Sequence, residues 1–173
     1  MKKFFLSIFA IIILFTNTAF CEEKILFIDM DRVISTSNPG VSILEQLNKL
    51  NKENILFFNK EEKIFKEKEI KLISQKNITS ESDFNSKVNK LKTEINDYNQ
   101  KKNKMINNFK KLKADNINKL SKSINAILVK YSVDNSISFI LQKKNLIIGK
   151  TELDITDKMV KIVNKKVSKF KIK

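Results

Sequence analysis

The chain has 173 residues and a formal net charge of +15, from 34 Lys and Arg against 19 Asp and Glu. It contains two Gly, one Pro and one Cys, and neither His nor Trp. So few turn residues exclude sandwich and barrel folds, and the absence of clustered Gly excludes Rossmann and Walker phosphate loops. With one Cys and no His, the chain cannot form a zinc site of Cys and His ligands, nor a disulfide within itself. We therefore expect a basic, long-helix protein without metal or cofactor. It is not expected to be an enzyme, because the usual general base, His, is missing.

The first 21 residues have the layout of a secretory signal peptide. A positively charged start precedes an apolar run over residues 4–15 and a small, polar stretch over residues 16–21. The small residues Ala19 and Cys21 predict cleavage after Cys21, which leaves a mature chain without cysteine. The apolar run is shorter than the about 20 residues that span a bilayer. An uncleaved membrane anchor remains the alternative, and Phe20 disfavours a lipoprotein site at Cys21.

A short strand and a short helix are expected next. Residues 24–30 are apolar and β-favouring but too few for a helix, which predicts a buried strand. Residues 31–38 continue as a short helix or turn, which Pro39 and Gly40 are expected to end.

A long helical hairpin is predicted after this point. No Gly or Pro occurs in the 108 residues from Val41 to Ile148. Residues 41–76 carry apolar side chains roughly every seven positions, which favours a single helix. Residues 77–80 form the expected turn at the tip, and the glycosylation sequon within them is a short pattern with frequent chance matches. Ser80 and Asp83 resemble a capping box and predict the start of a second helix.

The second helix carries the clearest periodic signal. Nine positions follow the alternating 4-3 spacing of a coiled-coil seam, and Lys102 is the one polar member. The nine are Phe84, Val88, Leu91, Ile95, Tyr98, Lys102, Met105, Phe109 and Leu112. The seam then resumes in a new phase at Ile117, Leu120, Ile124, Ile127 and Tyr131, a stutter-like slip. Two helices joined by so short a turn run antiparallel, so residues 41–131 are predicted to form a hairpin arm.

The chain is expected to return to β-structure after the arm. Residues 137–141 and 146–148 are predicted as two strands around a hairpin turn at residues 142–145. Thr156 is expected to cap a last helix, in which Val160, Val163 and Val167 share one face.

The predicted fold class is therefore α+β. Residues 22–40 and 132–173 form a β-rich body, and the helical hairpin is inserted between them. A body of roughly 60 residues is marginal on its own, and its open strand edges favour pairing with further copies of the chain. We therefore expect an oligomer. Its contacts are assigned to the body residues Ile25, Phe27, Ile137, Phe139, Leu141 and Ile147.

An ordered set of segments resembles the Skp/OmpH family of periplasmic chaperones of outer-membrane proteins. The arm matches this family in periodicity, and the order and spacing of the segments carry the resemblance. The segments are Lys24-Ile25-x-x-Ile28-Asp29-Met30-x-Arg32-Val33-Ile34, the hairpin, residues 131–141 and 146–149, and Leu153-Asp154-Ile155-Thr156-Asp157. The resemblance implies a homotrimer whose bodies join through strands and whose three hairpins surround a cavity. That cavity would hold unfolded β-barrel proteins in the periplasm without ATP.

The function predicted from the sequence is thus an ATP-independent periplasmic holdase that prevents aggregation of unfolded outer-membrane proteins. A membrane-tethered coiled-coil scaffold or adaptor of the cell envelope is the alternative, and it corresponds to the uncleaved N-terminus.

Two pairs of carboxylates are candidates for catalytic groups. Asp29 and Asp31 follow the end of the predicted strand, where Asp commonly caps the next helix. Asp154 and Asp157 surround the start of the last helix in the same way. We therefore expect structural roles for all four.

A basic run marks the middle of the second helix. Lysines fall at positions 101, 102, 104, 110, 111 and 113 with no acidic residue between them. A solvated helix face is the plain interpretation, and a binding surface for acidic or phosphate-bearing partners is the functional one. Export makes nucleic acid an unexpected partner. Unfolded clients, lipopolysaccharide and an anionic membrane surface remain, with Lys101, Lys102, Lys104, Lys110 and Lys111 as the predicted contacts.

Adjacent apolar pairs on the first helix suggest a second contact surface. Neighbouring helical residues point about 100° apart, so both members of Phe57-Phe58 cannot enter one narrow seam. A broad core stripe would explain the pairs equally well. The functional hypothesis is that a surplus, partly exposed column lines a client cavity, with Phe57, Phe58 and Phe65 as its contacts.

Overall fold

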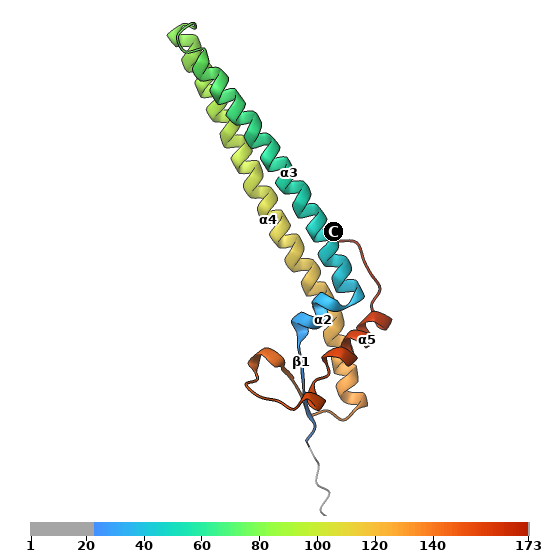
Figure 1. Ribbon diagram of the computed structural model, residues 1–173. Helices are drawn as coiled ribbons and strands as arrows, with labels where there is room; N and C mark the ends of the chain where they lie inside the picture. Colours follow the sequence, from blue (N-terminus) through green and yellow to red (C-terminus); the bar gives the residue numbers. More distant parts are fainter. Residues whose placement is uncertain (1–22, 173) are drawn as a thin grey trace, which may run out of the picture.

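The computed structural model describes residues 23–172, so the predicted signal peptide lies outside the described residues. Figure 1 shows a long two-helix arm that rises from a small body. Its elements in chain order are β1 (Ile25–Ile28), α2 (Met30–Thr36), α3 (Asn38–Ser74), α4 (Glu81–Asp134), β2 (Phe139–Gln142), the 3-10 turns η1 (Lys143–Asn145) and η2 (Thr151–Leu153), and α5 (Thr156–Lys166).

The predicted helical hairpin is confirmed. Helix α3 has 37 residues and α4 has 54, which makes α4 about 80 Å long at 1.5 Å per residue. The two helices lie side by side along the arm (Figure 1). The Ser80 hydroxyl accepts a hydrogen bond from the Asp83 amide at 3.2 Å, so Ser80 caps α4 as its spacing predicts.

The predicted seam of α4 faces α3 along the whole arm. Its nine positions from Phe84 to Leu112 are buried or half-buried, while most residues between them are exposed. After Leu112 the phase changes as the sequence indicates: Leu120 and Ile124 are buried, and Ile117, Ile127 and Tyr131 are half-buried. The buried position nearest the slip is Asn116, which the periodicity does not include. The Asn116 side chain donates a hydrogen bond to the Leu112 carbonyl at 2.7 Å, so a polar residue occupies the slip.

The corner between α2 and α3 differs from the prediction. Pro39 and Gly40 do not end the short helix but lie in the first turn of α3, where a proline loses no intrahelical hydrogen bond. A side-chain carbon at Gly40 would lie 1.6 Å from the Ile34 carbonyl oxygen, so only glycine fits this corner. The first amide of α3, that of Asn38, donates to the side-chain oxygen of Asn164 at 2.6 Å. A residue of α5, far away in the sequence, therefore caps α3.

The sheet of the body is smaller than predicted and is parallel. Strands β1 and β2 pair in the register Ile25 with Phe139 through Ile28 with Gln142. The predicted second strand at residues 146–148 and the hairpin turn before it were wrong, because this segment is an irregular loop beside η1. Its side chains Ile147 and Ile148 are almost fully exposed, so their apolar character reflects no buried strand.

The core of the body is mainly helical, so the expectation of a β-rich body needs correction. Buried residues from β1, α2, the root of the arm, the segment before β2 and α5 form one cluster. Its fully buried members include Val33, Ile43, Leu120, Ile124, Met159 and Val163. The body and the base of the arm therefore share one core, which fixes the direction in which the arm leaves the body.

Helix α5 begins differently from the prediction. Its cap residue is Ile155, so Thr156 is the first helical residue and not the cap. The Thr156 amide donates to the Asp154 carboxylate at 2.9 Å, so Asp154 supplies the acceptor at the start of the helix. The Thr156 side chain is buried and serves a tertiary contact instead: its oxygen accepts from the Asp29 amide at 2.9 Å. Its hydroxyl donates to the Asp154 carboxylate.

Across residues 23–172, no helix combines the length and apolar character that a bilayer crossing needs. Within the same range, no group of three or more acidic, Cys or His residues is placed to hold a metal ion.

Candidate functional site

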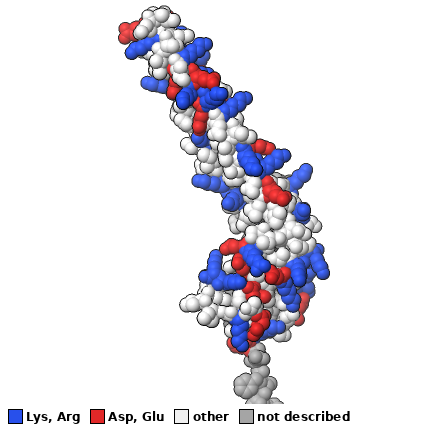
Figure 2. Space-filling model, viewed as in Figure 1, with Lys and Arg blue, Asp and Glu red and all other residues white. Residues whose placement is uncertain are grey.

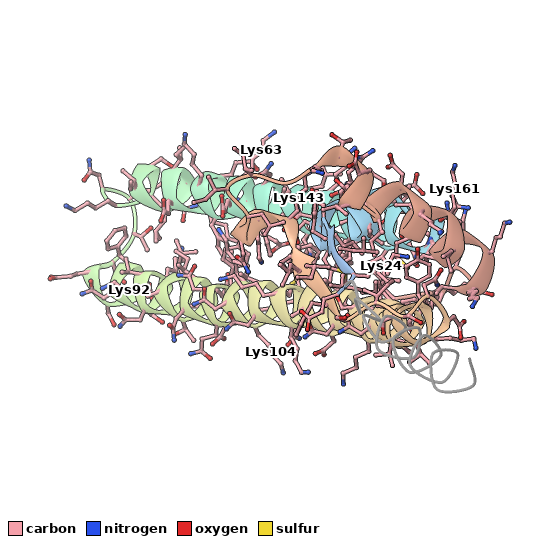
Figure 3. The ribbon with its side chains drawn as sticks, turned by 90° about the horizontal axis from the view of Figure 1, so that it is seen from below. Lys24, Lys63, Lys92, Lys104, Lys143 and Lys161 are labelled. Atoms are coloured by element: carbon pink, nitrogen blue, oxygen red, sulfur yellow. The ribbon has the colours of Figure 1, made fainter. Side chains whose placement is uncertain are left out.

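The face of α3 turned away from α4 carries exposed apolar side chains. Ile55, Leu56, Ile70 and Ile73 are 47%, 68%, 60% and 69% exposed. At about 100° per residue, the four lie within one sector of the helix, opposite the residues that pack against α4. Figure 3 shows Lys63, which belongs to this sector, pointing away from α4. We call Ile55, Leu56, Ile70 and Ile73 the α3 outer column.

Lysines accompany the α3 outer column. Lys52, Lys63 and Lys66 fall in the same sector, and a shallow groove beside Leu56 is lined by Lys49 and Lys52 among other polar residues. Figure 2 shows basic side chains spread along the whole arm, with acidic ones between them. Glu45 and Glu53 line the same groove, and Glu67 lies 3.9 Å from Lys63, so the outer face of α3 combines apolar side chains with charges of both signs.

The predicted aromatic contacts lie at a different place from the exposed column. Phe57, Phe58 and Phe65 are half-buried at the interface of the two helices. The Phe57 and Phe58 ring centroids are 6.0 Å apart, and Phe65 meets Tyr98 of α4 at 5.3 Å. The sequence alone does not show which of these rings face α4. The apolar residues of α3 lack the strict spacing of the α4 seam, so either member of an adjacent apolar pair could be the exposed one.

The predicted lysine contacts fall into two groups. Lys101 lies 4.8 Å from the centroid of the Phe57 ring and Lys102 lies 5.4 Å from that of Phe58, so both cover the aromatic interface. Lys104 and Lys110 are exposed on α4, and Figure 3 shows Lys104 pointing away from α3. Lys111 pairs with Asp115 one helical turn later at 2.6 Å.

Lys102 is accommodated at a position of the α4 seam because its ammonium forms an ion pair with Glu62 of α3. Its ammonium lies 2.5 Å from the Glu62 carboxylate, which also accepts from the Tyr98 hydroxyl at 3.1 Å. The hydrogen bonds from Lys102 and Tyr98 lower the pKa of Glu62, and the same bond to Glu62 raises the pKa of Lys102. Burial and the bond to Glu62 raise the pKa of Tyr98.

The predicted oligomerisation residues divide between the surface and the core. Ile25, Phe139 and Leu141 are exposed by 42%, 56% and 41% and share one face of the two-stranded sheet, because paired residues of parallel strands point the same way. Ile147, in the neighbouring loop, is fully exposed.

The other two predicted oligomerisation residues are buried within the chain. Phe27 lies under the loop at Gly149, where a side-chain carbon would come within 2.8 Å of its ring, and Ile137 lies in the core.

The second edge of β2 has no strand beside it among the described residues. Strand order in the sheet is β1 then β2, and the far side of β1 meets Asp154 through a single bridge. A groove next to β2 is lined by Ile137 and Ile140 together with Leu128 and Val129 of α4. Val129 is 65% exposed, so the open edge borders an apolar surface.

Three of the four carboxylates, those of Asp29, Asp154 and Asp157, have structural contacts. Asp29 caps α2 by accepting from the Arg32 amide at 2.9 Å, and Asp157 pairs with the Arg32 guanidinium at 2.7 Å. Partial burial works to raise the pKa of Asp154, but hydrogen bonds from Lys143 and Thr156 outweigh it and the pKa is lowered. Asp31 is exposed in the first turn of α2.

A family model described as outer membrane protein (OmpH-like) matches residues 24–163, which include the strand, the arm and most of α5. The chain belongs to this OmpH-like family. The resemblance to the Skp/OmpH family is therefore confirmed. The family is non-enzymatic, and so is this OmpH-like chain.

Solved structures agree on the fold. A crystal structure from Caulobacter crescentus CB15, described as a candidate OmpH-like outer membrane chaperone, matches with a TM-score of 0.78 over 87% of this chain and 89% of that chain. The two sequences are 12% identical, so this likeness shows the fold alone. No curated protein sequence matches the chain.

Proposed function

We propose that this OmpH-like protein is an ATP-independent holdase of the periplasm that binds unfolded outer-membrane β-barrel proteins and keeps them from aggregating. The α3 outer column carries this proposal: it exposes four large apolar side chains on a long arm that nothing in the chain covers within residues 23–172. These side chains form two pairs, Ile55-Leu56 and Ile70-Ile73, about 21 Å apart along one face of the helix, and each pair offers apolar contact to an extended partner. Export after cleavage at Cys21 belongs to the same proposal.

The binding surface is proposed to be diffuse. The α3 outer column supplies weak apolar contacts, and the half-buried Phe57, Phe58 and Phe65 stay predicted contacts at its margin. Lys101, Lys102, Lys104, Lys110 and Lys111 of α4 are proposed to hold acidic segments. The phosphates of lipopolysaccharide or of an anionic membrane are the further partners that such a surface fits.

We infer that the working form is a homotrimer in which residues 22–40 and 132–173 form the joined body and residues 41–131 form each arm. The unpaired edge of β2 and the exposed Ile25, Phe139, Leu141 and Ile147 support self-association. Closing these edges with further copies removes apolar surface from water, and three arms around one axis enclose a client from several sides.

Suppression of aggregation tests this function. A urea-unfolded outer-membrane β-barrel protein is diluted into detergent-free buffer with residues 22–173, and light scattering is followed over a range of ratios. We expect suppression without ATP that saturates near three chains per client. Unchanged scattering at every ratio would contradict the holdase and favour the envelope scaffold. Sequencing the N-terminus of the exported protein separates the free form from the tethered one.

A matched pair of variants tests the binding face. The variant I55S/L56S/I70S/I73S removes the α3 outer column and is expected to lose most of the suppression. The control N96S/N103S/N107S/A114S changes four exposed residues on the far face of α4 and is expected to retain it. Both should keep helical circular dichroism, because neither set lies in the interface of the two helices.

A further inference from the structure

The last described residues form a strap across the root of the arm. After α5 ends at Lys166, the chain runs in extended form back along α3 (Figure 1). Val167, Phe170 and Ile172 are half-buried and pack against the core cluster, while the residues between them are exposed. We call residues 167–172 the tail. Its side chains alternate between apolar and polar at Phe170, Lys171 and Ile172.

One side-chain amide holds the backbone of the tail. The Gln46 amide nitrogen donates to the Phe170 carbonyl at 3.1 Å, and the Gln46 amide oxygen accepts from the Ile172 amide at 3.2 Å. This two-point contact imitates the pairing that a neighbouring β-strand would give. The same nitrogen also lies 3.1 Å from the Ser42 carbonyl of α3, which fixes the orientation of the Gln46 side chain.

The site also seats an aromatic ring. The ammonium of Lys119 on α4 lies 4.4 Å from the centroid of the Phe170 ring, a cation–π contact. Gln46 and Lys119 therefore frame a site between the two helices at the arm's root. The hydrogen bonds from Gln46 reach only the backbone and do not depend on the sequence of the bound segment. The contact of Lys119 with an aromatic ring and the burial of Phe170 and Ile172 favour an extended segment with apolar residues at every second position.

Few contacts hold the tail against the rest of the chain. Among residues 23–172, the backbone of residues 168–172 hydrogen-bonds to Gln46 and to no other group. Two neutral hydrogen bonds, one cation–π contact and three half-buried side chains are few contacts for a segment that begins beyond the end of α5. A competing segment of the same chemistry can take its place.

We propose that Gln46 and Lys119 frame a binding site for extended segments of unfolded polypeptide with alternating apolar residues, and that the tail occupies this site as a displaceable strap. The identity of the ligand as a client segment rests on the proposed function, since strands of membrane-spanning barrels alternate in the same way. The tail thus reserves the site until a client segment displaces it.

Peptide binding tests the strap with the full mature chain. The probe is a fluorescent peptide, SKFKIK, and the control is SKKFIK, which has the same composition but no alternation. Binding to wild type, F170S/I172S and Q46A/F170S/I172S is measured by fluorescence anisotropy. We expect F170S/I172S to bind the probe at least tenfold more tightly than wild type, and Q46A to remove that gain. Equal binding by all three proteins, or equal binding of the control peptide, would overturn the site.

The unaltered chain gives a second readout that does not depend on the variants folding. Saturating probe should release the tail and speed hydrogen exchange at the Ile172 amide by at least tenfold, whereas the control peptide should not. Unchanged exchange would overturn the strap.

Light scattering on the same samples separates the two claims. If the wild-type chain suppresses client aggregation but no variant binds the SKFKIK probe, the peptide site is rejected and the holdase function stands. If the probe binds but client aggregation is not suppressed, the site for extended peptides stands and the holdase function is rejected.

Discussion

Lys102 shows how a charged residue is accommodated in an apolar seam. Its long stem lies among half-buried rings, its ammonium is 5.4 Å from the centroid of Phe58 and 5.9 Å from that of Tyr98, and Glu62 of α3 neutralises it. Lys68 of α3 and Glu94 of α4 form a second ion pair between the helices at 2.6 Å. The two pairs favour the observed register, because a shift of either helix would separate the charges.

Replacing Glu62 by Gln should lower the melting temperature near neutral pH, with a loss that disappears in acid. The pKa of Glu62 is below its ordinary 4.5 in the folded chain, so its contribution is present above 4.5 and is lost as pH falls through the folded pKa. Melting curves of wild type and E62Q, followed by circular dichroism, should therefore differ at pH 7 and converge in acid. A constant difference at all pH values would contradict the charge pair.

Thr156 ties the start of α2 to the start of α5 through one buried hydroxyl. Thr156→Val should cost about 1–3 kcal/mol of unfolding free energy, because it leaves the Asp29 amide without its acceptor. The matched variant Thr156→Ser keeps the hydroxyl and should cost less. Urea unfolding measures both, and an equal cost would show that the methyl group and not the hydroxyl matters.

Along α4, burial changes from root to tip. Leu120 and Ile124 at the root are fully buried in the shared core, whereas Leu91 in the arm is half-buried in a two-helix interface. A pair of helices has little interior, so most of the stability of the arm comes from its attachment to the body. The far part of the arm therefore has fewer buried contacts to hold it than the root has.

The gradient predicts unequal costs for equal truncations. Leu120→Ala should cost about 2–5 kcal/mol of unfolding free energy, because it empties a fully packed site. Leu91→Ala should cost less, since its side chain is already half in water. Urea unfolding of the two variants decides the point, and an equal cost would mean that the arm is packed as tightly as the body.

Sequence periodicity predicted α4 well because its apolar residues repeat strictly and each repeat adds to the signal. Periodicity on α3 was weaker, so the prediction placed Phe58 and Phe65 in the exposed column, whereas Ile55, Leu56, Ile70 and Ile73 form it. Apolar residues 146–148 read as a strand because local composition does not reveal whether a partner strand is nearby. The parallel pairing of β1 with β2 joins residues more than a hundred positions apart, beyond the reach of any local pattern.

At the scale of the whole molecule, the chain is a long two-helix arm attached to a small body, with a formal net charge of +15. Basic side chains along the arm should attract acidic clients over distances that salt screens, with a Debye length of about 8 Å at physiological ionic strength. The affinity for a net acidic unfolded client should therefore fall by about tenfold or more between low and high salt. Fluorescence anisotropy with a labelled client measures this affinity at low and high salt. An affinity that does not change with salt would mean that the lysines contribute to solubility and not to client binding.

Site-specific crosslinking tests the central claim most directly, namely that the outer face of α3 holds an unfolded client. A photoreactive side chain is placed at Leu56 in one variant and at Lys161, an exposed residue of α5 in the body, in the other. Each variant is then irradiated with an unfolded outer-membrane protein under conditions of saturating suppression. We predict strong crosslinks from position 56 and weak ones from position 161. Equal crosslinking from both positions, or stronger crosslinking from position 161, would contradict the account.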